Sequence, residues 1–341
     1  MTRLLIGLFL LTLVPPASCQ QPDMEHTPFR IGEINYFGYA GVDVAAIRAQ
    51  LPLHPGDSLT FATFREEPMK AVITRITGQP PTDLNITCCD DAKRLLIYIG
   101  LGGASSHSQS TATPPHGLDH LDPEALRLYD EDMKGLERAV TAGNAGEDDS
   151  QGYMLSNDPA LHQINLAMHT YAVTREAEFI RVLHMATDPR QRRVAATFLG
   201  YVLRSTTQVE ALVQAVGDPD DEVRNNAVRA LWVLSSSHNG QPLDMDPQPF
   251  IALLFSGKWT DRNKSSLLLF RLTENRDSKL LATLREKAMQ PLIEGASWTG
   301  DPGHSDPFLV ILGRIAGIPN DKLQKLVDAH DTAAIIGAAG H

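Results

Sequence analysis

The sequence predicts a small α+β domain near the N-terminus, followed by an all-α helical solenoid. Two observations lead to this prediction. Between Phe29 and Leu101, runs that alternate apolar and polar residues are interleaved with runs of helical periodicity. From Asp158 onward, apolar residues recur at helical intervals, and Asp-Pro or Gly turns separate the runs. A chain of 341 residues is long enough for two or three domains with a buried core.

The composition is that of an acidic globular protein. Hydrophobic residues make up 43% of the chain and charged residues 21%, which is ordinary for a folded domain. The formal net charge is −11, and much of it lies between Asp119 and Asp158. Nucleic-acid binding needs clustered Lys and Arg, so we expect no nucleic acid among the partners.

The first residues have the layout of a secretory signal. Arg3 precedes an apolar run from Leu4 to Val14, and small residues follow up to Cys19. The apolar run is too short to span a bilayer stably, and no later segment is long enough to do so. We therefore predict that residues 1–19 are a signal peptide and that the protein is exported.

The residues before Cys19 leave two mature N-termini open. Pro16-Ala17-Ser18-Cys19 resembles a bacterial lipoprotein box, which implies that Cys19 is lipidated and becomes the first residue of the mature chain. Pro16 stands where that family has Leu or a similar aliphatic residue, and ordinary cleavage near Cys19 is the alternative. In both cases we expect the protein in the periplasm or cell envelope, with a possible lipid anchor and no transmembrane span.

Residues 29–101 predict the order strand, helix, helix, strand, strand. The first strand, FRIGEINYFG, ends at Gly38. VDVAAIRAQL predicts a helix capped by Asp43, and Pro68 suits the first turn of a second helix. LNITCC and KRLLIYIGL predict the last two strands, which are separated by a polar turn. These residues predict one small α+β domain.

The stretch IGEINYFGYAGVDVAAIRAQLPLHPGDSL resembles a POTRA domain, a module of bacterial envelope proteins. The resemblance rests on the strand Ile31–Phe37, the helix around Ile47 and the Gly56-Asp57 turn. It implies that residues 29–101 present an exposed sheet edge to which another chain can add a strand. A compact cap without a ligand is the alternative.

Two adjacent cysteines, Cys88 and Cys89, lie in the predicted strand LNITCC. Neighbouring residues of a strand point to opposite faces, so we expect one buried and one half-exposed thiol. A strained vicinal disulfide, and a redox or metal role with Asp90 and Asp91, stay open as alternatives.

Two segments separate the α+β domain from the solenoid. Residues 102–120 are rich in Gly, Ser, Thr and Pro and predict a flexible linker. Residues 121–157 predict an acidic helix and loop, with Asp122 as the N-cap. The cluster Asp130-Glu131-Asp132 lacks the alternating ligands and the glycine of a calcium loop, so we expect it on a solvated helix face.

Residues 158–330 predict stacked helix pairs. DPRQRRVAATFLGYVL begins at Asp188 and DPDDEVRNNAVRALWVL begins at Asp218, 30 residues later. Each stretch has Asp-Pro, a charged turn, small residues and then an apolar ridge. Such spacing is typical of helix-pair repeats, which bury their apolar faces only against neighbouring repeats. We expect both aspartates to cap helices.

This plan resembles the HEAT repeat, or the HEAT-like repeats of bilin lyases. The resemblance implies that Asp218 caps the second helix of its pair, and that Arg224, six residues later, reaches an aspartate of a neighbouring repeat. The repeat that begins at Asp188 departs from the pattern at this position, where only Arg192 or Arg193 could substitute.

Two tryptophans are candidates for an exposed interaction surface. Trp259 and Trp298 lie next to predicted turns, whereas Trp232 lies within an apolar ridge and is expected in the core. We therefore take Trp259 and Trp298 as candidate contacts with a partner.

The sequence shows no catalytic motif. It has no GxSxG, no HExxH, no phosphate-binding Gly-rich loop and no paired CxxC, so we predict no catalytic, cofactor or metal residues. The resemblance to HEAT repeats implies a non-catalytic scaffold that binds other proteins in the bacterial cell envelope. The alternative is a lyase-like or metal-dependent enzyme built on the repeats, by analogy at the level of fold. The sequence does not predict which protein is the partner.

Overall fold

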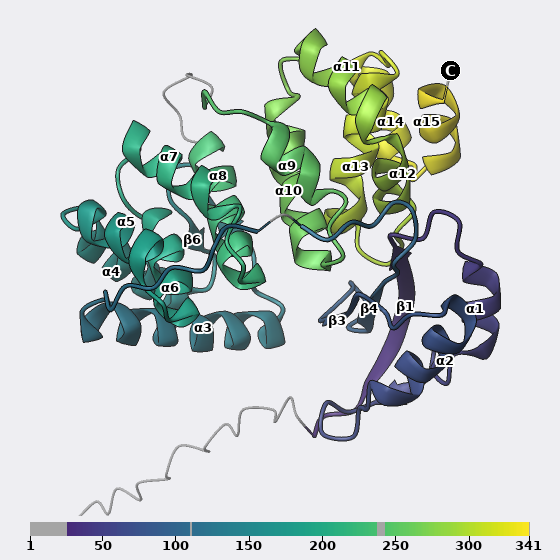
Figure 1. Ribbon diagram of the computed structural model, residues 1–341, viewed down its shortest axis with the longest axis horizontal. Helices are drawn as coiled ribbons and strands as arrows, with labels where there is room; N and C mark the ends of the chain where they lie inside the picture. The colour runs from purple at the N-terminus through teal and green to yellow at the C-terminus, as the bar shows by residue number, and fades with distance from the viewer. Residues whose placement is uncertain (1–25, 110, 237–242, 341) are drawn as a thin grey trace, which may run out of the picture.

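The computed structural model describes residues 26–109, 111–236 and 243–340, so the predictions for the signal peptide and for Cys19 lie outside the described residues. A small sheet with two helices lies at one end of a long array of helices (Figure 1). The prediction of a small strand-containing domain followed by a helical repeat array is therefore confirmed. None of the described helices is both long and apolar enough to cross a membrane.

The small domain consists of a four-stranded sheet and two helices. Strand β4 is parallel to β1 and antiparallel to β3, and the sheet order is β2-β1-β4-β3. The short strand β2, between the two helices, was not predicted. The elements are β1 (Phe29–Phe37), α1 (Val44–Gln50), β2 (Ser58–Leu59), α2 (Glu67–Thr77), β3 (Asp83–Thr87) and β4 (Leu95–Gly100).

Strand β4 is buried on both faces. Leu95, Ile97 and Ile99 pack in the core that includes α1 and α2, whereas Leu96 and Tyr98 belong to the core of the helical array. All six residues of the strand are buried. A strand covered on both sides has an uninterrupted apolar sequence, which explains the run LLIYIG. The sheet is thus a middle layer between two helices of its own domain and the array.

The helical array follows in sequence. It starts with one long helix, continues through a short hairpin of two strands, and then consists of helices alone. The elements are α3 (Pro123–Ala142), β5 (Glu147–Asp148), β6 (Leu155–Ser156), α4 (Pro159–Ala172), α5 (Glu176–Met185), α6 (Pro189–Leu199), α7 (Thr206–Ala215), α8 (Asp221–Ser236), α9 (Gln248–Leu253), α10 (Trp259–Leu272), α11 (Ser278–Lys287), α12 (Met289–Ala296), α13 (Pro302–Ile315), α14 (Asn320–Asp328) and α15 (Thr332–Ala339).

Four helices of the array form an inner layer. Helices α6, α8, α10 and α13 each pack against the next, while α5, α7 and α9 pack on the outside as partners of α6, α8 and α10. Their apolar side chains form one continuous core. A helix pair in such an array buries its apolar face only against its neighbours, so the core continues from one pair to the next.

The described part of residues 102–120 runs along the helical array instead of bridging two domains freely. Three of its backbone amides donate to carbonyls in successive turns between helices: His107 to Phe255, Ala112 to Gly217, and Gly117 to Met185, at 2.7–2.8 Å. The prediction of a flexible linker rested on composition alone. Gly, Ser and Pro lack apolar periodicity, but they leave the backbone free to bond to a neighbouring surface.

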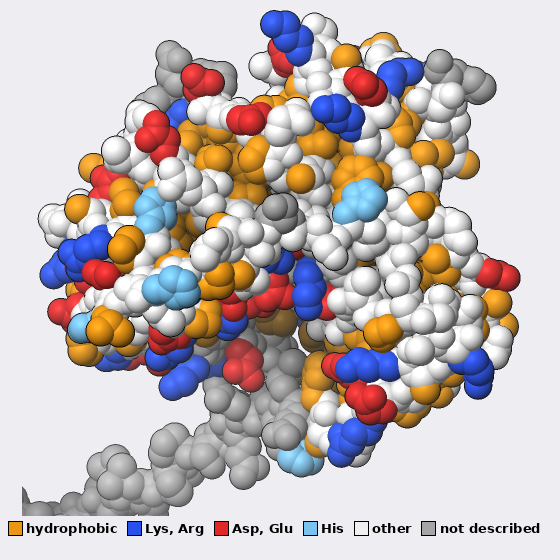
Figure 2. All heavy atoms as spheres, in the orientation of Figure 1, with side chains coloured by type: hydrophobic (Ala, Val, Ile, Leu, Met, Phe, Trp, Pro, Cys, Tyr) orange, Lys and Arg blue, Asp and Glu red, His pale blue; other side chains and the backbone are white. Residues whose placement is uncertain are grey.

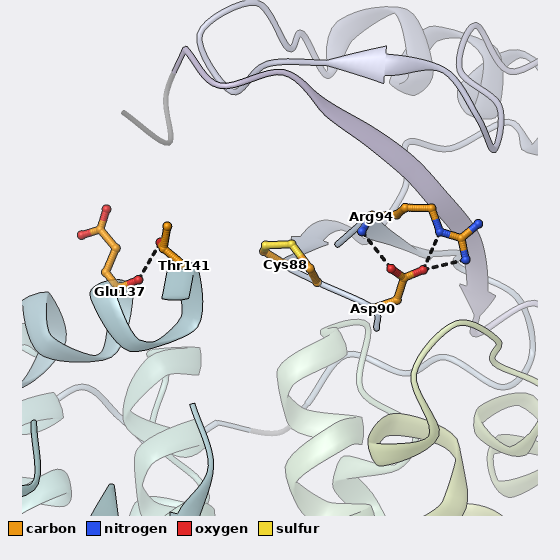
Figure 3. Close-up of a disulfide and its surroundings, with 6 residues drawn as sticks. Cys88, Asp90, Arg94, Glu137 and Thr141 are labelled. Carbon is orange, nitrogen blue, oxygen red and sulfur yellow. Dashed lines mark hydrogen bonds and ion pairs between the residues drawn. A yellow bond between two sulfur atoms is a disulfide. The ribbon is translucent and has the colours of Figure 1, made fainter. Parts of the chain in front are cut away.

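Cys88 and Cys89 form a disulfide at the end of β3 (Figure 3). Both residues are half-buried and pack at the edge of the small domain's core. The expectation of one buried and one half-exposed thiol is therefore wrong, and the alternative of a vicinal disulfide holds. Asp90 is engaged by the Arg94 guanidinium at 2.7–2.8 Å, so its carboxylate serves the turn between β3 and β4.

Trp259 and Trp298 lie between the small domain and the array. The ring of Tyr98 on β4 stacks on Trp259 at 4.8 Å and meets the edge of Trp298 at 5.2 Å. Trp298 is 4% exposed and Trp259 is 7% exposed. The prediction that they form an exposed surface for a partner is therefore wrong. Both were placed correctly next to turns, but the sheet of the α+β domain covers those turns.

The two tryptophans differ in one hydrogen bond, which gives a matched test of this interface. Trp298 Nε1 donates to the Tyr36 carbonyl at 3.0 Å, whereas Trp259 Nε1 is buried and has no partner among the described residues. Trp298→Phe is expected to lower the free energy of unfolding by about 1–2 kcal/mol more than Trp259→Phe, because only the first loses a hydrogen bond. Urea unfolding of both variants measures the difference, and equal losses would contradict this interface.

Candidate functional site

The aspartates of the two Asp-Pro turns have different roles. Asp188 caps α6, and its side chain accepts from the Arg190 amide at 2.9 Å. Asp218 was predicted to cap α8 in the same way, and this is wrong. Helix α8 begins three residues later, and Asp220 accepts from the Val223 amide at 3.0 Å. The sequence DPDD contains three aspartates, and the middle one, Asp220, serves as the cap.

Asp218 instead belongs to a ladder of three buried ion pairs between successive repeats. Arg192 binds Asp218 at 2.7 and 2.8 Å. Two further ion pairs follow: Arg224 on α8 binds Asp261 on α10 at 2.7 and 3.0 Å, and Arg262 on α10 binds Glu294 on α12 at 2.9 Å. Each arginine also donates to carbonyls in the turn before its own helix. Of the two arginines that could substitute in the first repeat, Arg192 is thus the one that belongs to the ladder.

The ladder fixes the inner helices, and a charged cavity lies farther along the same helices. Its volume is about 240 Å³. Side chains from α3, α4, α6, α8, α10 and the β5–β6 hairpin line it. The residues that give it polar character include Tyr129, Asp132, Glu147, Tyr201, Arg229 and Lys264. The cavity brings several titratable groups together, so we take it as the candidate functional site.

Asp132 is a carboxylic acid of the cavity with a raised pKa. Asn165 Nδ2 donates to its carboxylate at 2.6 Å. Burial raises the pKa of Asp132 to about 6, although the Arg229 charge and the Asn165 hydrogen bond oppose the shift. The cluster Asp130-Glu131-Asp132 was expected to be solvated throughout. Asp130 and Glu131 do form surface ion pairs with arginines, but Asp132 lines the cavity.

Lys264 is the base of the cavity. Burial, together with repulsion from Arg229, lowers the pKa of Lys264 to about 8, while Glu147 and Glu222 oppose the shift. Among the described residues, no hydrogen bond or ion pair reaches its ammonium group. A cation without a partner inside a cavity is available to an anionic group of a ligand.

The β5–β6 hairpin closes one side of the cavity. Arg229 on α8 binds Glu147 on β5. The Tyr153 ring stacks on His169 of α4 at 3.8 Å, and Asn165 accepts from the Ser156 amide at 2.9 Å. The hairpin is therefore tied to both the long inner helix α8 and the first helices of the array.

The raised pKa of Asp132 predicts a pH-dependent stability. In the unfolded chain an aspartate titrates near pH 4, so between about pH 4 and 6 the folded protein binds the proton more readily. The stability from this site is present below pH 4 and is lost as the pH rises through 6. Asp132→Asn cannot titrate, so its free energy of unfolding should gain about 1–3 kcal/mol relative to wild type between pH 4 and 7.

Urea unfolding at several pH values measures this difference. Asp130→Asn is the matched control, because Asp130 lies on the same helix and pairs with Arg190 outside the cavity. Curves for wild type and Asp132→Asn that run parallel between pH 4 and 7 would contradict the assignment. A change of the same size in Asp130→Asn would also contradict it.

The cavity was missed by sequence reasoning because its residues come from five helices and a hairpin. One signal was nevertheless present. Asp132 has the same helical spacing as the buried residues of α3, which are Ala125, Leu128, Gly135 and Ala139. A carboxylate on the buried stripe of a helix indicates a polar site. Lys264 and Arg229 carry no comparable signal, because their helices have charged residues on several faces.

No metal site is present in the described ranges 26–109, 111–236 and 243–340, where no three His, Cys, Asp or Glu side chains are close enough to hold an ion. The structure places Asp188, Asp218 and Arg224 in turns and in the ladder, outside the cavity. Trp259 and Trp298 lie at the interface with the small domain.

Comparisons with known proteins give little. No protein-family model matches the sequence, and no curated protein matches it. Among solved structures, a designed armadillo repeat protein is similar to this chain at 15% sequence identity. The match covers 53% of this chain and 94% of the designed protein, with a TM-score of 0.37. A likeness this slight carries no argument about function.

Proposed function

We propose that the protein is an exported, non-catalytic scaffold that binds another protein through the cavity face of its helical array, in the bacterial cell envelope. The observation that supports this most is Lys264, a cation that has no partner among the described residues and lies in a cavity of the inner layer. The cavity of about 240 Å³ is smaller than most small-molecule sites, which measure about 300–1,000 Å³. It suits a side chain or chain end of a protein partner.

We further propose that the array is of HEAT type and that the small domain is POTRA-like. The ladder supports the first assignment, since Arg224 lies six residues after Asp218 and binds an aspartate in the next repeat. The element order of residues 29–101 supports the second. The export proposal rests on the layout of the first 19 residues.

Affinity capture from envelope extracts of the native host tests the binding proposal. Wild type is compared with Lys264→Glu and with Lys279→Glu, a control on the exposed surface of α11. We expect one protein to be recovered with wild type and with the control but not with Lys264→Glu, because the reversed charge repels the partner's anionic group. Equal recovery with all three would contradict a site at the cavity.

The intact mass of the protein from its host tests export. We expect a chain that begins near Cys19, with or without lipid on its sulfur. A chain that retains residues 1–19 would contradict export.

An enzyme remains the second candidate, lyase-like or metal-dependent, and one observation favours it. The cavity joins a carboxyl with a raised pKa to an amine with a lowered pKa, which is typical of catalytic sites. Native mass spectrometry of protein purified from its host separates the two candidates. An enzyme or small-molecule carrier would retain a stoichiometric ligand or metal that Lys264→Glu loses, whereas the scaffold proposal predicts none.

A further inference from the structure

Three cations form a row on the inner helices. Arg229 lies on α8, and Lys264 and Arg271 lie seven residues apart on α10, so the latter two share a helix face. Arg229 and Lys264 both line the cavity, and Arg271 lies beyond them, with its guanidinium 5.8 Å from the Trp232 ring. We call these three residues the cationic row. It stands out in a chain with a net charge of −11.

Strand β5 and the residue that follows it lie on this row with their carboxylates. Glu147 binds Arg229, and Asp149 lies 3.8 Å from Arg271. Glu147 and Asp149 are two residues apart, so in extended chain their side chains point to the same face. An acidic segment of the protein's own chain therefore occupies the cationic row in the free protein.

The fit of the hairpin to the row is incomplete. Asp149 Oδ2 and Arg271 Nε are buried, and neither has a hydrogen-bond partner among the described residues. The 3.8 Å separation of Asp149 and Arg271 is longer than a hydrogen bond. Lys264, the third cation of the row, has no carboxylate bound to it among the described residues. Buried polar atoms without partners weaken an interaction, so the hairpin is a poor occupant of the row.

We propose that the cationic row binds an extended acidic segment of the partner protein, and that this segment displaces β5 and Asp149 from the row. The inference rests on the proposed function. A segment with carboxylates at alternate positions presents them on one face, where they reach Arg229, Lys264 and Arg271 together. It thus satisfies the cation that the hairpin leaves unpaired.

Strand β5 has only two residues, so an extended segment can take its place beside β6. The base of the hairpin is held by the Asn157 amide, which donates to the Gly146 carbonyl at 2.8 Å. The stacking of Tyr153 on His169 holds the returning strand on α4. Glu147 and Asp149 bind Arg229 and Arg271 of the cationic row, and two antiparallel residue pairs join β5 to β6. These are the contacts that a partner's segment would replace.

A peptide titration of the full chain tests the inference. The probe is a fluorescein-labelled synthetic peptide with the hairpin sequence GEDDSQGY, and its control has Gln and Asn in place of the acids. The double variant Glu147→Gln/Asp149→Asn frees the row with isosteric changes. We expect the acidic peptide to bind this variant at least about tenfold more tightly than wild type, and the control peptide not to bind. Circular dichroism establishes that the variant is folded.

A third substitution tests the role of Lys264. Adding Lys264→Gln to the double variant is expected to weaken peptide binding about fivefold or more, and adding Lys279→Gln is expected to leave it unchanged. Hydrogen exchange on wild type gives a second readout, because the peptide should speed amide exchange in residues 147–149.

Equal peptide affinity for wild type and the double variant, or no effect of Lys264→Gln, would overturn the inference. These outcomes are distinguishable from failure of the proposed function. If capture of a host protein still depends on Lys264, the proposed scaffold function is retained and only the proposed acidic segment is rejected. If capture is also independent of Lys264, both proposals are rejected.

Discussion

Glu294→Ala is expected to lower the free energy of unfolding by about 3–5 kcal/mol and to loosen the small domain from the helical array. Glu294 is fully buried and binds Arg262 at 2.9 Å. It also accepts from the Gly38 amide at 2.7 Å and from the Ser105 hydroxyl. One carboxylate thus joins α10, α12, the end of β1 and the segment that follows β4. Its removal leaves the Arg262 charge buried without a partner.

The surroundings of Gly38 show how little this junction can adapt. Gly38 has φ +67°, and a Cβ added to it would lie 2.3 Å from the Leu101 carbonyl. The Leu101 carbonyl thus packs directly against Gly38, whose amide donates to Glu294. The cost of Glu294→Ala should therefore not be recovered by local rearrangement.

Urea unfolding measures the stability, and limited proteolysis within residues 102–120 reports the loosening. Glu286→Ala, on the exposed surface of α11, is the control and should change the free energy of unfolding by no more than about 0.5 kcal/mol. Glu294→Ala with stability within about 1 kcal/mol of wild type would show that the junction does not depend on this pair.

The second large effect is expected from the ladder. Arg224→Leu and Asp261→Leu should each cost about 3–5 kcal/mol, because each leaves a buried charge unpaired. Arg224 is 5% exposed and Asp261 is 1% exposed. The double variant should be more stable than the sum of the single losses predicts, because it buries no charge. Arg190→Leu, which breaks an exposed pair with Asp130, should cost less than about 1 kcal/mol.

A double-mutant cycle by urea unfolding gives the coupling between Arg224 and Asp261. Additive losses, or a cost for Arg224→Leu no larger than for Arg190→Leu, would contradict the role of the ladder in fixing the spacing of the repeats.

Periodicity predicted the elements of the fold, because each helix and strand shows its buried face in its own residues. The strand LLIYIG and the helices after the Asp-Pro turns are examples. The prediction was less accurate where several neighbouring residues of the same chemical type could each have served as the helix cap. DPDDEV contains four carboxylates around the start of α8, and sequence spacing favoured Asp218 over Asp220 as the cap.

Contacts between distant segments could not be predicted in this way. Trp259 and Trp298 look exposed when only their own turns are considered, and β4 covers them from about 160 residues or more away in the sequence. The described part of residues 102–120 likewise has no pattern that reports its backbone bonds to the array. The cavity could not be predicted for the same reason, because Asp132 lies on α3 and Lys264 lies on α10, far away in the sequence.

The central claim is that a partner protein reaches the cavity face. Photo-cross-linking in cells of the native host tests it most directly. A photo-reactive amino acid is placed at Met133, which lines the cavity and is 44% exposed, or at Met185 on α5, which is 49% exposed and outside it. The account predicts one discrete adduct from position 133, lost in Lys264→Glu, with the cross-link mapped to an acidic segment. The same adduct from position 185, or an adduct from 133 that persists in Lys264→Glu, would contradict it.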